Sequence, residues 1–159
     1  MSKDINFSGV SIYQGKSLIL TDVTFNIAHG EFVYLIGKTG TGKSSLLKTI
    51  YGDLPLRAGN AQVAGFDLEK MNWKTVPYLR RKLGIIFQDF QLLMDRSVDD
   101  NLEFVLRATG TNDKSLIKLK SDEALKRVGL QSKGFKMPHE LSGGEQQRVV
   151  IARAIINDP

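Results

Sequence analysis

The chain has 159 residues, which is enough for one domain with a sizeable hydrophobic core. With 42% hydrophobic and 25% charged residues, its composition is that of a soluble globular protein and excludes disordered and fibrous architectures. It has no cysteine, which excludes disulfides and thiolate metal sites, and its two histidines, His29 and His139, are too far apart in the sequence to predict a metal centre. No apolar run is long enough to span a bilayer or to form a secretory leader, so the sequence predicts a cytoplasmic protein.

The net charge is +5, from 22 basic and 17 acidic side chains. The basic excess lies at Lys74, at residues 80–82 and along residues 114–136. These stretches lack the interleaved aromatic side chains that are typical of single-strand binding, and no helix-turn-helix or zinc-finger spacing is present. The charge therefore favours a solvated exterior, and no nucleic-acid partner is expected.

The first part of the chain has strand patterns. Residues 5–13 alternate in part between apolar and polar side chains, and residues 19–25 are flanked by glycines, which predicts two half-buried antiparallel strands. Residues 32–36 are apolar without interruption, a pattern typical of a strand that is buried on both faces of a parallel sheet. Residues 83–87 are a second candidate for such a strand.

Helical patterns follow. One begins near Lys43, and a short one covers residues 76–82 after a stretch rich in turn formers at residues 55–65. Residues 98–130 have an amphipathic helical pattern with one break at residues 110–112.

The last helical pattern begins after Ser142. With Glu145 three residues later, Ser142 forms a capping-box sequence, which predicts a helix that runs through Ala154. Apolar side chains occupy nearly every face of this helix, so we expect neighbouring elements to cover it on several sides.

A glycine-rich loop precedes the first helix and matches the phosphate-binding (Walker A) pattern Gly-x-x-x-x-Gly-Lys-Ser/Thr. It consists of Gly37, Lys38, Thr39, Gly40, Thr41, Gly42, Lys43 and Ser44, and Ser45 follows it. Glycines allow consecutive N–H groups to turn towards phosphate oxygens, and the helix adds its positive end. We expect Lys43 to reach the β- and γ-phosphates and Ser44 to ligate Mg²⁺. The loop predicts binding of a nucleoside triphosphate, and by itself leaves kinases, GTPases, helicases and transport ATPases open.

A second motif narrows the class. It consists of Leu141, Ser142, Gly143, Gly144 and Glu145, followed by Gln146, Gln147 and Arg148. Its glycines lie at a predicted helix N-terminus, which is an anion site in its own right. With the phosphate loop, this motif resembles the ATP-binding-cassette (ABC) family, whose signature is Leu-Ser-Gly-Gly-Gln/Glu. The resemblance implies that a second copy pairs head-to-tail across two ATP molecules, and that Ser142 to Glu145 of one copy cover the γ-phosphate held by the other.

Two further positions agree with the order of motifs in this family. Tyr13 resembles the aromatic residue that stacks on adenine. The alternative interpretation is that Tyr13 is an ordinary aromatic residue of a strand, since tyrosine favours strands. Gln88, at the end of the second buried-strand candidate, resembles the glutamine of the Q-loop. The resemblance implies that Gln88 is a catalytic residue that ligates Mg²⁺ and senses the attacking water. Arg148 and Arg153, on the last helix, are expected to bond within the fold rather than to contact nucleotide.

Residues 79–93 and 140–149 are similar to the cell-division branch of the ABC family, the FtsE type, and the likeness runs over nearly the whole chain. It implies an integral membrane partner of the FtsX type, whose cytoplasmic helix docks beside the Q-loop. It also implies a peripheral location at the cytoplasmic face of the inner (plasma) membrane, where ATP-driven closure would control cell-wall hydrolases. The alternatives are an ATPase of lipoprotein release or small-molecule export, and a non-hydrolytic ATP-binding switch module. An ABC ATPase that acts on DNA is disfavoured, because no sustained heptad pattern is present.

The ABC family has further motifs after the signature helix. These are a strand that ends in an aspartate for Mg²⁺ and a glutamate that polarises water (Walker B), and then a switch histidine. The sequence has no counterpart of them before Pro159, so we expect a fragment that hydrolyses ATP poorly or not at all on its own. The absent strand would lie beside residues 32–36, and its absence predicts an exposed apolar edge.

The expected fold is an α/β P-loop NTPase domain of ABC type over residues 1–159. It would have a mostly parallel sheet, an antiparallel β patch at the N-terminus and a helical subdomain inserted at about residues 92–142. The expected function is Mg-ATP binding and, in the full-length parent, ATP hydrolysis that drives a membrane partner in cell division.

Overall fold

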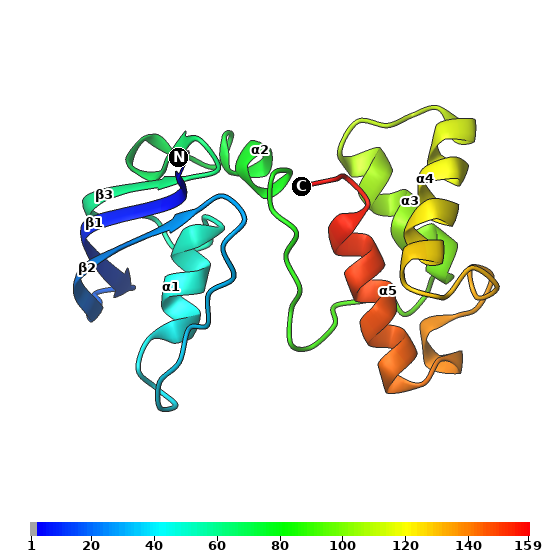
Figure 1. Cartoon of the computed structure of the whole chain (residues 1–159), viewed down its shortest axis with the longest axis horizontal. Coiled ribbons are helices and arrows are strands. Elements are labelled where there is room, and N and C mark those ends of the chain that lie inside the picture. The colour runs from blue at the N-terminus through cyan, green and yellow to red at the C-terminus, as the bar shows by residue number, and fades with distance from the viewer. Residues whose placement is uncertain (1–2) are drawn as a thin grey trace. The chain divides into compact units, whose positions relative to one another are not determined.

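The computed structural model describes residues 3–159, which form two compact units, residues 3–83 and 84–159 (Figure 1). In chain order, the elements are β1 (Lys3–Gln14), β2 (Ser17–Ala28), α1 (Lys43–Ile50), β3 (Ala58–Val63), β4 (Phe66–Asp67), the 3-10 turn η1 (Leu68–Lys70), α2 (Val76–Arg80), α3 (Val98–Ala108), α4 (Lys114–Arg127), the 3-10 turn η2 (Pro138–Glu140) and α5 (Gly143–Ile155). Each unit has its own hydrophobic core. Within residues 3–159, no helix has both the length and the apolar character that crossing a membrane requires.

The first unit is built on a four-stranded antiparallel sheet of order β2-β1-β3-β4. β1 and β2 form a hairpin whose last pairs are Tyr13 with Leu18 and Gln14 with Ser17. Near the other end of the hairpin, the rings of Phe7 and Phe25 stack with centroids 4.9 Å apart. The antiparallel patch predicted from residues 5–13 and 19–25 is therefore confirmed.

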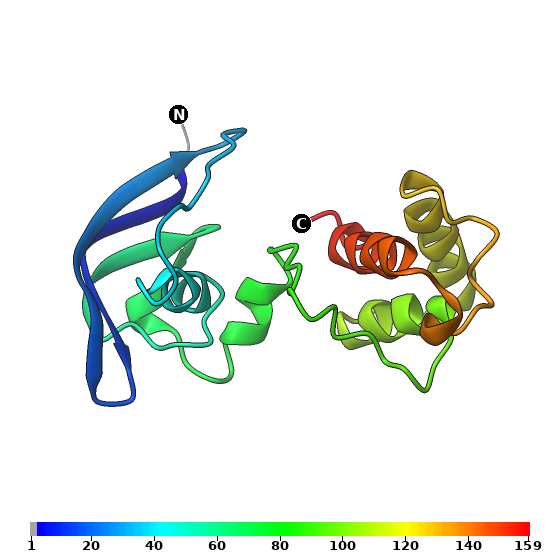
Figure 2. The ribbon, with the colours of Figure 1, turned by 90° about the horizontal axis from the view of Figure 1, so that it is seen from below.

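α1 packs on one face of this sheet (Figure 2). Leu46 of α1 joins the core that Phe7, Val10 and Ile12 of β1 form. At the C-terminal end of α1, the Arg80 guanidinium donates to the carbonyl oxygens of Tyr51 (3.0 Å) and Gly52 (3.4 Å). A cation at this end is favourable because the helix carries partial negative charge there.

β3 lies within residues 55–65, for which the sequence predicts only turns. β3 pairs with β1, with Phe7 opposite Ala61 and Ile5 opposite Val63, and buries Ala61 and Val63 in the core. Gly59 is a poor strand former, so pairing with β1 determines this strand more than its own propensity does.

The parallel strands expected at residues 32–36 and 83–87 are not formed, so this part of the prediction is wrong for the structure. Both segments are irregular, and Phe32 and Ile36 are 81% and 85% exposed. Within residues 3–159, no strand pairs with either segment. A lone extended segment leaves its N–H and C=O groups without a ladder, so apolar composition by itself does not produce a strand.

The second unit is a cluster of three helices, α3, α4 and α5. Its core includes Leu102 and Leu106 of α3, Leu125 of α4, and Val149 and Val150 of α5. The helical pattern at residues 98–130 with one break is thus confirmed. α5 contacts both α3 and α4, as its nearly all-round apolar pattern predicts.

Candidate functional site

The glycine-rich loop connects residue 36 to α1 and folds in the way its sequence predicts. Gly40 and Gly42 have φ values of +83° and +89°, a region that side chains other than glycine rarely adopt. At Gly42, a Cβ atom would lie 2.9 Å from side-chain carbons of Ile19 and Leu20 on β2. This position therefore requires glycine for its conformation and for the space it leaves, and the end of the loop is fixed against the sheet.

The N-terminus of α1 offers several hydrogen-bond donors. The first helical bond runs from the N–H of Leu46 to the carbonyl of Gly42 (2.9 Å), so the N–H groups of Lys43, Ser44 and Ser45 have no partner within the helix. The first turn carries no acidic side chain that would neutralise the positive helix end. This arrangement fits a phosphate group.

The Lys43 side chain curls back over the loop. Its ammonium group donates to the carbonyl oxygens of Gly37 (2.8 Å) and Lys38 (2.7 Å). The Thr41 hydroxyl donates to the same Lys38 oxygen at 2.8 Å. These bonds hold a cation at the centre of the loop, where a phosphate oxygen can accept from it.

The two serines after Lys43 differ in exposure. Ser44 is exposed and presents its hydroxyl at the first turn of α1, whereas Ser45 is buried and offers its backbone N–H. Mg²⁺ in nucleotide sites takes few protein oxygens and keeps phosphate and water oxygens. The exposed hydroxyl of Ser44 is a neutral oxygen donor that fits this preference, since the phosphates supply the negative charge.

Tyr13 lies near the end of β1 in the same unit and is half-buried. The Arg57 guanidinium lies over its ring at 5.7 Å from the centroid and donates to the carbonyl of Gly15 at 2.7 Å. Tyr13 pairs with Leu18, and Leu20, two residues further along β2, faces Gly42. The structure thus places the tyrosine on the hairpin against which Gly42, at the end of the loop, lies.

Gln88 lies in an exposed turn of the second unit. The two residues that follow Asp89, Phe90 and Gln91, have φ values of +58° and +49°. Arg153 of α5 donates to the carbonyl oxygens of both residues. The prediction that Arg153 bonds within the fold is confirmed, although no local sequence pattern indicates which carbonyls it binds.

The signature residues form the N-terminus of α5. The backbone N–H and the hydroxyl of Ser142 both donate to Glu145 Oε2 at 2.9 Å, and the Glu145 N–H donates to the Ser142 hydroxyl at 3.3 Å. The predicted capping box is therefore confirmed. Gly143 and Gly144 are exposed in the first turn and leave their N–H groups available to an anion.

The hydrogen bonds from the Ser142 backbone and hydroxyl lower the pKa of Glu145 below its ordinary value of 4.5, and Lys133, 3.4 Å away, lowers it further. A lowered pKa in the folded chain means that the ionised carboxylate stabilises the fold. This contribution is complete above pH 4.5 and is lost as the pH falls through the lowered pKa.

Replacement of Glu145 by glutamine tests this pH dependence. Glutamine keeps the geometry of the capping box but does not titrate. We expect the wild type to be more stable than Glu145→Gln at neutral pH, and this difference to shrink as the pH falls below 4.5 and through the lowered pKa of Glu145. Urea unfolding of both proteins across this range measures the difference, and other carboxylates cancel in the comparison. A difference that does not change with pH would contradict the expectation.

The predicted site residues fall into two groups. Tyr13, the phosphate loop and Ser45 belong to the first unit, whereas Gln88 and the signature residues belong to the second. Within the second unit, Arg153 links the turn after Gln88 to the helix that the signature begins.

Comparisons with known proteins agree with these motifs. The family described as "ABC transporter" matches residues 20–159. The chain is 45% identical over 156 residues to the cell division ATP-binding protein FtsE of Escherichia coli K12. The aligned region covers 98% of this chain and 70% of that protein. It is 41% identical over 150 residues to FtsE of Streptococcus pneumoniae D39, and this aligned region covers 94% of this chain and 65% of that protein. The chain thus spans about two thirds of the length of these relatives.

Solved structures give the same result. The dimeric post-hydrolysis state of the ATP-binding cassette MJ0796, bound to ADP and Pi, matches with a TM-score of 0.83 and 30% identity, over 98% of this chain and 70% of that one. The ABC transporter component cbiO1 of Clostridium perfringens matches with a TM-score of 0.86 and 28% identity, over 100% of this chain and 63% of that one. The expected fold class is therefore confirmed, and the chain belongs to the ABC transporter family.

Proposed function

We propose that this chain is the ATP-binding part of an FtsE-like subunit that drives a membrane partner in cell division. The observation that carries the proposal is the phosphate loop, in which the Lys43 ammonium and the free N–H groups of α1 converge at one helix end. The similarity to FtsE over most of the chain supports the cell-division role.

Binding would begin at the loop. The triphosphate would draw the Lys43 ammonium from the carbonyls of Gly37 and Lys38 to its β- and γ-oxygens, and accept from the N–H groups of residues 43–45. Tyr13 would stack on adenine with the ring face that Arg57 leaves open. Ser44 and Gln88 would hold Mg²⁺, which supplies charge neutralisation at the phosphates.

Hydrolysis would require a second copy. The exposed N–H groups of Gly143 and Gly144 and the Ser142 hydroxyl would face the γ-phosphate bound to the partner's loop. The dimeric form of the related cassette MJ0796 supports pairing in this family. Residues 92–142 would act as the helical subdomain of the complete ABC domain.

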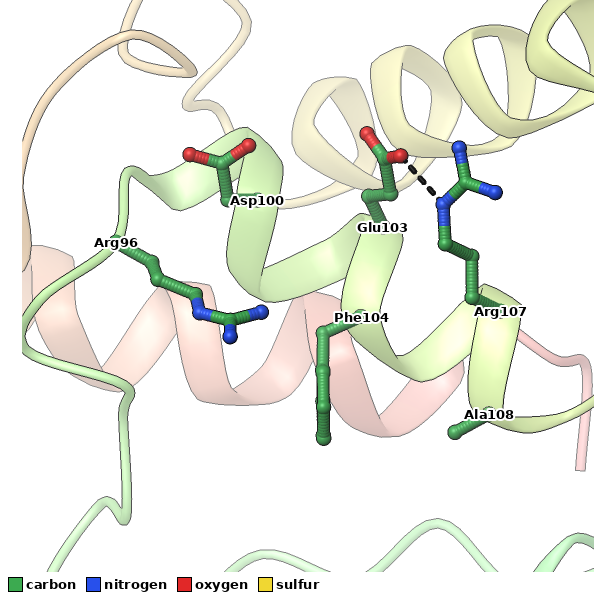
Figure 3. A pocket seen from close by; sticks show the side chains of 6 residues that line it. All are labelled: Arg96, Asp100, Glu103, Phe104, Arg107 and Ala108. Atoms are coloured by element: carbon green, nitrogen blue, oxygen red, sulfur yellow. Dashed lines mark hydrogen bonds and ion pairs between the residues drawn. The ribbon is translucent and has the colours of Figure 1, made fainter.

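A membrane partner of the FtsX type would contact the second unit. A hollow of about 460 Å³ lies along α3. It is lined by the side chains that Figure 3 labels, Arg96, Asp100, Glu103, Phe104, Arg107 and Ala108. Glu103 and Arg107 form an ion pair at 2.6 Å, and the Arg96 guanidinium lies 5.4 Å from the centroid of the half-exposed Phe104 ring. An apolar ring within charged side chains suits a cytoplasmic helix that carries both apolar and polar residues.

The first test uses the protein as its own gene encodes it. The intact mass of the protein purified from its own cells is compared with the 17.7 kDa of these 159 residues. Its Mg-ATP binding and ATP hydrolysis are then assayed. Binding followed by hydrolysis supports the proposal. Binding without hydrolysis favours a non-hydrolytic switch module, and absence of binding refutes the proposal. Identification of the membrane protein that copurifies separates a role in cell division from lipoprotein release or export.

Ser142→Arg tests pairing. The arginine removes the hydroxyl and places a long side chain where the glycines must approach a phosphate, so we expect ATP-dependent dimerisation to weaken by about tenfold or more. Mg-ATP binding by the monomer is expected to be unchanged, because its loop lies in the other unit. Light scattering after gel filtration with and without ATP measures the dimer fraction.

Ser97→Arg is the matched control. Ser97 caps α3 with the same capping box, through Asp100, so its replacement costs a similar loss of helix stability. A dimer lost equally in both variants would count against a direct role of Ser142.

A further inference from the structure

The turn after Gln88 has an unfavourable backbone conformation. Phe90 and Gln91 are consecutive residues in the left-handed region, with φ values of +58° and +49°, and neither is glycine. Bulky side chains rarely adopt this conformation, which persists only where surrounding contacts impose it. The residues around the turn therefore must supply those contacts.

Arg153 of α5 supplies them from one side. Its Nη1 donates to the Gln91 carbonyl at 2.5 Å and its Nη2 to the Phe90 carbonyl at 2.7 Å, so one planar guanidinium fixes both left-handed peptides. The next residue of α5, Ala154, lies against the chain before Gln88: a Cβ at Gly84 would be 3.0 Å from the Ala154 carbonyl oxygen. The end of α5 thus contacts the chain on both sides of Gln88.

The segment beyond the turn is fixed by a second buried polar residue. Asn101 of α3 is 1% exposed. Its side chain accepts from the Leu93 N–H at 2.8 Å and donates to the carbonyls of Leu93, Arg96 and Ser97 at 3.0, 3.3 and 2.9 Å. Leu92, between the two anchors, is buried in the core of the unit. The chain from Phe90 to Ser97 is therefore tied to the helices, and Gln88 extends from its anchored end.

We propose that Arg153 is a positioning residue that couples Gln88 to the signature helix. Arg153 lies eleven residues after Ser142, or roughly 16 Å along the helix axis at 1.5 Å per residue. A displacement of the signature end is passed along the rigid α5 to the turn through the two bonds of Arg153. The effect on ATP hydrolysis rests on the proposed function. The coupling between Arg153 and the turn after Gln88 is a property of the second unit alone.

Hydrogen exchange of the protein as its gene encodes it tests the coupling without nucleotide. In Arg153→Met, we expect amide exchange at residues 88–93 to rise by about tenfold or more, while α3 and α4 stay protected. Arg153→Lys, which keeps the charge but lacks the planar pair of donors, is expected to be intermediate. Arg127→Met is the control, because it removes only an exposed ion pair to Asp158 at 3.5 Å.

A second substitution separates positioning of the turn from general stabilisation of the unit. Glycine adopts the left-handed region at no steric cost, so Gln91→Gly relaxes the conformation that Arg153 holds. We expect Arg153→Met to raise exchange at residues 88–93 less in the Gln91→Gly background than in the wild type. An equal rise in both backgrounds, unchanged exchange, or a uniform rise over the whole unit would overturn the proposal.

Kinetics tests the consequence for the reaction. If the wild type hydrolyses ATP, Arg153→Met is expected to lower kcat by about tenfold or more and to change the Kd for Mg-ATP by less than about twofold. Loss of nucleotide affinity with unchanged kcat would refute the positioning role. A wild type that binds no ATP would refute the proposed function instead, and the exchange experiment would still decide the coupling.

Discussion

Replacement of Lys43 by alanine is expected to weaken Mg-ATP binding by about a hundredfold or more. Each charge-assisted hydrogen bond contributes about 1.5–3 kcal/mol, and about 1.4 kcal/mol corresponds to a tenfold change in affinity. The ammonium would bond two phosphates, and its bonds to the carbonyls of Gly37 and Lys38 are given up in exchange. The carbonyl oxygens are neutral whereas the phosphate oxygens are anionic, so the exchange favours the bound nucleotide, and we expect loss of the ammonium to cost at least about 2.8 kcal/mol, or two factors of ten.

Lys48→Ala is the matched control, because Lys48 lies on the same helix, in its last turn. Lys48 is half-exposed and forms an ion pair with Asp53 at 3.7 Å, which contributes little to stability. Isothermal titration of both variants with Mg-ATP measures the dissociation constants. We expect wild-type affinity for Lys48→Ala, and an unchanged affinity for Lys43→Ala would refute the assignment of the phosphate loop.

The parts of the site that depend on short-range chemistry were predictable from the sequence. The loop needs glycine where φ is positive, as at Gly42, and the signature needs an N-cap serine with an acidic residue three positions later. Both patterns act within a few residues, so a single sequence contains all the information they require. The structure confirms the helix and the cap at these positions.

The parts that depend on distant neighbours were not predictable in the same way. The apolar run at residues 32–36 describes the environment that a buried strand needs, but no described strand provides it, and the segment stays irregular. β3 has a weak strand sequence and forms because β1 lies beside it. The partners of Arg153 are about sixty residues away in sequence, and no local pattern marks carbonyl acceptors.

The incomplete alternation at the start of the chain has its cause in a bulge. Ser8 of β1 pairs with Asn60 and Ser11 with Ala58, so two residues of β1, Gly9 and Val10, lie opposite Gly59 alone. Gly9 has φ +60°, as expected where a glycine takes the left-handed position of a bulge. The extra residue turns Val10 towards the core that Phe7 also faces, although the two are three positions apart.

Gly59→Ala is therefore expected to have the largest effect on stability, a loss of at least about 4 kcal/mol, or failure of the first unit to fold. A Cβ there would lie 2.4 Å from the Gly9 carbonyl oxygen and 2.6 Å from Val10 Cα, and these backbone atoms cannot move without breaking the bulge. Urea unfolding measures the loss, with Gly65→Ala as the control.

Gly65 has almost the same conformation as Gly59, φ +82° against +84°, but a Cβ there would meet no atom within 4 Å. Gly65→Ala thus isolates the conformational cost, roughly 1–2 kcal/mol. Equal losses in the two variants would mean that β1 and β3 separate at little cost. If the bulge is as rigid as the contacts indicate, the excess loss at Gly59 measures how strongly it sets the register of β1. That register determines which face of the sheet presents Tyr13, so the adenine contact proposed for Tyr13 would depend on a glycine that lies outside the phosphate loop.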